Sequence, residues 1–178
     1  MTREDVQDLL AMIQGTYSNF NPQNKTVTIN TWLMALEDFD RNQIAMAFKS
    51  YVRTDTSGFA PTPGKLIDRI SLIKHLNDET ETEAWMRVAI ALRNGAYGYE
   101  EEFAKFPPMV QKAVGSAKQL QIWALDEHFN EEVAKAQFLR VYRTESQRAY
   151  DYEKLPGEVQ RLIDNARGMN KITAGEVD

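Results

Sequence analysis

The stretch GFAPTPGKLIDRI, residues 58–70, ends one helical pattern and begins the next. Thr62 is placed to cap a new helix, and Pro63 suits the first helical turn, where its missing N–H costs nothing. The stretch therefore predicts a tight connection between two helices. We interpret the turn as structural; the functional alternative is that an exposed Phe59 and the following helix form part of a partner surface.

Apolar residues recur at helical spacing on both sides of this turn. The pattern predicts helices over 3–18, over about 30–37, from a cap at Asp40, and from Pro63 onward. Thr2 can cap the first helix, and the alternation of residues 27–29 (VTI) predicts an extended entry into the second. Residues 1–76 are thus expected to form an N-terminal four-helix domain.

A polar segment, NDETET at residues 77–82, is the predicted link to a second helical part. Helices are expected over about 82–94, over about 106–115, after a cap at Ser116, and from a cap at Asn130 to about 150. A loop is expected over 95–102, and a last short helix after residues 155–157 (LPG). The predicted fold is all-α, with two small helical domains in tandem (1–76 and 82–167) and a flexible, disordered C-terminal tail over 168–178.

Composition narrows the class of protein. The chain has 178 residues, 43% of them hydrophobic, a formal net charge of −5 and no cysteine. Residues 1–76 carry eight basic and eight acidic groups, so the second half holds the whole charge deficit. A general nucleic-acid binder is expected to be basic, so this charge balance disfavours that class. It suits a protein that acts on other proteins. The lack of cysteine, of a signal peptide and of a long apolar run favours a cytoplasmic protein.

The sequence offers no catalytic constellation. His75 follows an apolar stripe near a helix end, where a cation is favoured, so its predicted role is structural. His128 lies among acidic residues that could bind a metal, although no second histidine stands at ligand spacing and a solvated helix end is the simpler interpretation. Gly64 and Lys65 lack the spacing and the hydroxyl of a phosphate-binding loop. We therefore expect no enzyme activity, no cofactor and no metal.

Arginines and tyrosines alternate near residue 140, a pattern that can hold phosphates and stack bases. The same residues also fit an exposed helix face with local ion pairs. Five methionines could line a partner groove, although at helical spacing core packing is the default: Met12, Met34, Met46, Met86 and Met109. The candidate partner-binding residues are Phe59, Lys65, Arg69, Arg140, Arg143 and Arg148.

The order of segments in the first half resembles the bacteriophage helicase loaders, typified by the loader and inhibitor of a phage replicative helicase. The resemblance covers roughly residues 3–75. It rests on WLMAL at 32–36, on Ile44-x-x-Ala47-Phe48-x-x-Tyr51, on PTP at 61–63 and on Leu66-Ile67. The second half is similar to prophage replication proteins, in FPPMV at 106–110 and FLRVYR at 138–143.

This resemblance implies a non-enzymatic replication accessory protein that binds the hexameric replicative helicase of host or phage, inhibits it and delivers it to an initiator at the origin. The family's C-terminal segment is largely unfolded, whereas residues 82–167 here are expected to fold. Which half of the chain binds the helicase is therefore left open. Three alternatives stand beside this: a DNA-binding replisome organiser using Arg140–Arg148, a phage structural or packaging adaptor, and an enzyme with a metal site around His128.

Overall fold

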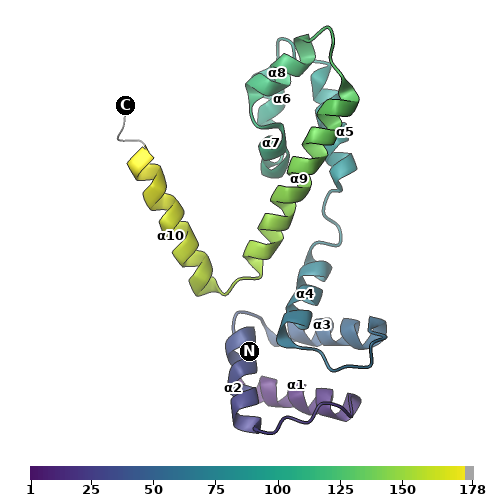
Figure 1. Cartoon of the computed structure of the whole chain (residues 1–178), viewed down its shortest axis with the longest axis vertical. Helices are drawn as coiled ribbons and strands as arrows, with labels where there is room; N and C mark the ends of the chain where they lie inside the picture. Colours follow the sequence, from purple (N-terminus) through teal and green to yellow (C-terminus); the bar gives the residue numbers. More distant parts are fainter. Residues whose placement is uncertain (175–178) are drawn as a thin grey trace. The chain divides into compact units, whose positions relative to one another are not determined.

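The computed structural model describes residues 1–174, the last six of them by backbone alone, and every element in this range is helical (Figure 1). Contacts within the chain divide it into two units. Unit 1 comprises Met1–Leu76 together with the chain from Glu153 onward, and unit 2 comprises Asn77–Tyr152. The all-α fold class is confirmed. The division into independently folding domains stays a prediction, because the grouping rests on contacts alone.

Unit 1 begins with four helices: α1 (Arg3–Thr16), α2 (Lys25–Leu36), α3 (Arg41–Thr54) and α4 (Pro63–Lys74). The predicted caps are all in place, since the Thr2, Asp40 and Thr62 side chains each accept a hydrogen bond from a first-turn amide. The connection between α3 and α4 (Figure 1) spans residues 55–62, and Pro63 is the first residue of α4. The core of these helices consists of buried Val6, Leu9, Leu10, Ile13, Trp32, Leu36, Ile44, Ala47, Phe48, Tyr51 and Leu66.

The second helix starts earlier than the sequence predicted. Residues 27–29, expected to be extended, lie inside α2, and the Asn24 side chain caps it by accepting from the Val27 amide at 3.1 Å. Three β-branched residues have too small an intrinsic preference to outweigh a capped helix that also buries Trp32 and Leu36. The prediction of an extended entry was therefore wrong.

Unit 2 holds α5 (Glu81–Leu92), α6 (Tyr99–Ala104), α7 (Pro108–Val114), α8 (Ala117–Leu125) and most of α9 (Glu131–Glu153). The predicted caps Ser116 and Asn130 each accept from an amide three residues on. The expected loop over 95–102 was wrong in its second half, because three glutamates in the first turn of α6 favour a helix N-terminus. In the core of unit 2, the ring centre of Trp85 lies 5.4 Å from the ring centre of Phe138.

The last helix, α10 (Gly157–Ala174), is longer than the short helix that the sequence predicted. The predicted tail begins at Gly168, but a single glycine inside a helix costs only about 1 kcal/mol and need not stop it. The predicted tail, 168–178, thus starts within α10, and residues 175–178 lie outside the described residues.

Three apolar residues that stand at helical spacing with the buried stripes are exposed: Val52, Ile73 and Val133. Each lies at the edge or the end of its helical stripe, where period alone does not tell a buried position from a solvated one.

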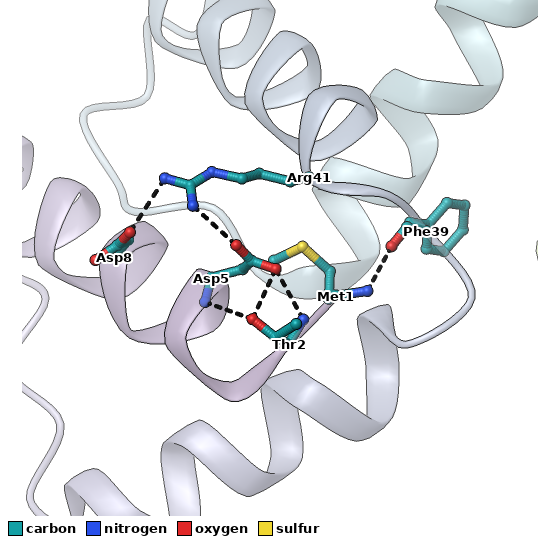
Figure 2. A network of polar contacts seen from close by, with 6 residues as sticks. All are labelled: Met1, Thr2, Asp5, Asp8, Phe39 and Arg41. Carbon is teal, nitrogen blue, oxygen red and sulfur yellow. Dashed lines mark hydrogen bonds and ion pairs between the residues drawn. The ribbon is translucent and has the colours of Figure 1, made fainter.

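A polar network joins the start of α1 to the start of α3 (Figure 2). The Arg41 guanidinium contacts Asp5 at 2.9 Å and Asp8 at 3.1 Å. The amide and hydroxyl of Thr2 both donate to Asp5 at 2.8 Å, which holds the pKa of this carboxyl below its ordinary value of 3.8. Ion pairs this exposed contribute little by themselves, so the network mainly fixes how α1 and α3 begin.

Replacing Leu66 by alanine should destabilise unit 1 strongly. Leu66 is fully buried at the start of α4, and loss of a leucine side chain from a packed core costs about 2–5 kcal/mol. The free energy of unfolding from urea titration of the full chain measures it. Leu72→Ala, on the exposed side of α4, is the matched control and should change it little. Equal effects of the two changes would contradict the core as described.

The Asp5 network should make stability depend on acid pH. Because the folded protein holds the pKa of Asp5 below 3.8, the contribution is full above 3.8 and disappears as the pH falls through the lower folded value. The Asp5→Asn variant should therefore be less stable than the parent at neutral pH, with the difference shrinking on acidification. Thermal melts across this range test the sign, and a difference that grows in acid would refute it.

Candidate functional site

Among the residues that the structure describes, no three histidine, cysteine, aspartate or glutamate side chains gather as a metal site would require. His128 is exposed, and its amide donates to the nearby Asp126 carboxylate. His75 caps the C-terminus of α4, and its Nε2 atom lies 2.9 Å from a carboxylate oxygen of Glu153. The candidate sites that follow are exposed surfaces.

Side-chain hydrogen bonds from Ser57, Asn19 and Tyr51 hold the loop between α3 and α4, residues 55–62. Ser57 donates to the Asp55 carboxylate from both its hydroxyl (2.7 Å) and its amide (3.2 Å). The Asn19 amide group donates to the Gly58 carbonyl at 3.2 Å, and Gly58 has a positive φ of 72°, which glycine adopts without strain. The Ser57 hydroxyl holds the pKa of Asp55 below its usual value.

The Tyr51 hydroxyl is the third support of this loop. Tyr51 lies in α3 with 2% of its surface exposed, and its hydroxyl donates to the Phe59 carbonyl at 3.1 Å. The Lys65 ammonium donates to the same hydroxyl at 3.1 Å and lies 5.4 Å from the centre of the ring. This hydrogen bond raises the pKa of Lys65. Burial raises the pKa of the neighbouring Tyr17, whose ring centre is 6.3 Å from that of Tyr51.

These contacts leave the Phe59 side chain directed away from the core, with 64% of its surface exposed. Loops usually lose conformational entropy when they become ordered on binding, and a loop already fixed by its own hydrogen bonds avoids much of that cost. An exposed aromatic side chain on a loop whose backbone is fixed is a suitable anchor for a protein partner. The loop with Phe59 is therefore the candidate interaction site.

The other predicted residues of unit 1 are placed less directly for binding. The Lys65 ammonium is engaged by Tyr51, so its first role is to support the Phe59 loop. Arg69 follows one turn later in α4 and is half-buried. Sequence reasoning named Phe59 and Lys65 but missed Tyr51 and Asn19, because a core tyrosine and a linker asparagine carry no local signal of the loop that they support.

The arginines of unit 2 are largely neutralised. Arg143 contacts the Glu81 carboxylate at 2.7 Å, and Arg148 contacts Glu145 at 2.5 Å. Arg140 is exposed, with no ion pair to any side chain that the structure describes. Phosphate binding at this helix would have to break the existing pairs, which weakens the case for direct DNA binding there. A role of these three residues in binding stays a prediction.

Four of the five methionines named above are exposed rather than packed in a core: Met12, Met34, Met46 and Met86. Only Met109 packs against the core of unit 2. The default expectation that these methionines pack in the core was therefore wrong for the four, because they lie outside the buried stripes of their helices. Flexible, polarisable methionine side chains at a surface suit contact with a partner.

None of the helices in the described part of the chain is long and apolar enough to cross a membrane. Residues 1–67 match the family model for the N-terminal domain of the helicase loader and inhibitor of phage SPP1. Comparison with curated proteins gave no match, and neither did comparison with solved structures. The resemblance to phage helicase loaders is thus confirmed for the segment that contains α1, α2, α3 and the Phe59 loop.

Removal of the Tyr51 hydroxyl should loosen the loop. Tyr51→Phe leaves the Phe59 carbonyl and the Lys65 ammonium without this partner, at a cost of roughly 1–3 kcal/mol in the free energy of unfolding. Amide hydrogen exchange over residues 55–62 should accelerate in the variant. Tyr97→Phe, at a side chain 97% exposed, is the control and should change neither quantity. Unchanged exchange in Tyr51→Phe would mean that the loop does not depend on this hydroxyl.

Proposed function

We propose that this chain is a phage replication accessory protein that binds the replicative hexameric helicase of host or phage, keeps it inactive and delivers it to an origin-bound initiator. The match of residues 1–67 to the helicase loader and inhibitor family carries this proposal. The role fits a protein of the bacterial cytoplasm that performs no catalysis of its own.

The Phe59 loop supplies the contact in this proposal. It lies within the matched segment, its Phe59 side chain is exposed, and the backbone of Phe59 is held by a hydrogen bond from Tyr51. Phe59 would insert into an apolar recess on the helicase, and Arg69 would lie at the border of that contact. Copies bound around the ring would block the motor or the DNA channel until delivery.

The first experiment mixes the purified full chain with the host replicative helicase and follows size-exclusion chromatography with light scattering. The proposal expects a co-eluting complex whose mass gives the number of copies per ring. The helicase's ATPase rate should then fall as the chain is titrated in. Separate peaks for the two proteins, with an unchanged ATPase rate, would contradict the proposal.

Phe59→Ala should weaken binding to the helicase by roughly tenfold or more, the loss typical of a buried aromatic anchor. The fold should be unaffected because the side chain lies outside the core. Val27→Ala, which removes another exposed apolar side chain of unit 1, is the matched control and should bind like the parent. Equal affinities of the parent and Phe59→Ala would remove the loop from the interface while leaving helicase binding itself intact.

Direct DNA binding through α9 is the competing outcome. Labelled duplex DNA titrated with the parent and with Arg140→Ala distinguishes the two hypotheses. The helicase proposal expects weak, nearly identical DNA binding by both proteins. Tight, salt-dependent binding that Arg140→Ala abolishes would favour the replisome organiser instead.

A further inference from the structure

The outer face of α3 carries exposed basic side chains. The core side of α3 holds Ile44, Ala47, Phe48 and Tyr51. On the opposite side, Met46, Lys49, Ser50 and Arg53 follow one another at helical spacing of three and four residues, so that they share one face. We call this the α3 outer face.

The charge of this face is not compensated. The sequence of α3 contains three basic residues and no acidic one. Arg41 is paired with Asp5 and Asp8 at the other end of the helix. Lys49 and Arg53 form no ion pair with any side chain that the structure describes. The two lysines of α4 differ, since Lys65 donates to the Tyr51 hydroxyl and Lys74 pairs with Glu153.

The same face combines charge with apolar surface. Met46 is 54% exposed, which leaves a long, adaptable side chain beside the two cations. A shallow hollow of about 560 Å³ runs along it, lined by Met46, Lys49, Ser50, Arg53 and Thr54. Because all of these side chains come from one helix, their spacing is set before any partner arrives.

We propose that the α3 outer face binds an acidic peptide segment that carries an apolar side chain. Carboxylates of the partner pair with Lys49 and Arg53, and the apolar side chain contacts Met46. Two cations on a single helix are few for a nucleic-acid backbone, and an exposed methionine beside them adds nothing to phosphate binding. The proposal goes beyond helicase loading and needs no helicase for its test.

The experiment measures fluorescence anisotropy of a short labelled peptide with aspartates and glutamates around a Leu-Phe pair, titrated with the full-length chain. The double variant Lys49→Glu/Arg53→Glu should weaken binding by about tenfold or more, since it replaces attraction by repulsion at both positions. Met46→Ala should weaken it by a smaller factor. Lys112→Glu, at an exposed lysine of α7, is the matched charge control and should leave the affinity unchanged.

Two further probes decide between chemistries. A peptide with asparagine and glutamine in place of the acids should not bind, and a single-stranded oligothymidine should bind more weakly than the acidic peptide. Arg53 also suits the C-terminal turn of α3, so a thermal melt of the double variant confirms that it is folded. The proposal would be overturned if the acidic peptide did not bind, or if the double variant bound it as well as the parent does. It would also be overturned if the oligonucleotide bound more strongly than the peptide and the double variant lost that binding.

Discussion

The first unit depends on one buried hydroxyl. Tyr51 sits in the core of α1–α4 with almost none of its surface exposed, yet its phenol oxygen is polar and needs partners inside the protein. It finds them in the Phe59 carbonyl and the Lys65 ammonium, one on each side of Thr62 and Pro63. The tyrosine therefore joins the end of α3, the loop and the start of α4 into one rigid piece.

This constraint decides which side chains face solvent. The backbone of Phe59 is tied to the core while its side chain is exposed, and the exposed Lys65 donates its ammonium to the Tyr51 hydroxyl. The α3 helix, fixed by its inner face and by the Arg41 network at its start, presents Met46, Lys49 and Arg53 on its outer face. The two proposed contact surfaces thus differ in kind, one an apolar loop and the other a basic helix face.

Much of this architecture could be predicted from the sequence, because it rests on local rules. The caps at Thr2, Asp40 and Thr62 and the stripe of Ile44, Ala47, Phe48 and Tyr51 each follow from spacing of three and four residues. Local rules did not predict three features of the helices. Capping by Asn24 gives α2 its early start, acidic residues at a helix start favour α6, and tolerance of a glycine lengthens α10. The support of the Phe59 loop was also hidden: the hydrogen bond from Asn19 to Gly58 spans 39 positions, and no pattern along the chain indicates such a pair.

The central claim is that the preformed Phe59 loop is where this chain meets a replicative helicase. The most direct measurement is amide hydrogen exchange of the full chain, alone and with the host helicase at saturating concentration. We expect slower exchange over residues 55–62 and the first turn of α4 in the complex. Protection confined to unit 2 or to α10, with the loop unchanged, would contradict it and place the contact elsewhere in the chain.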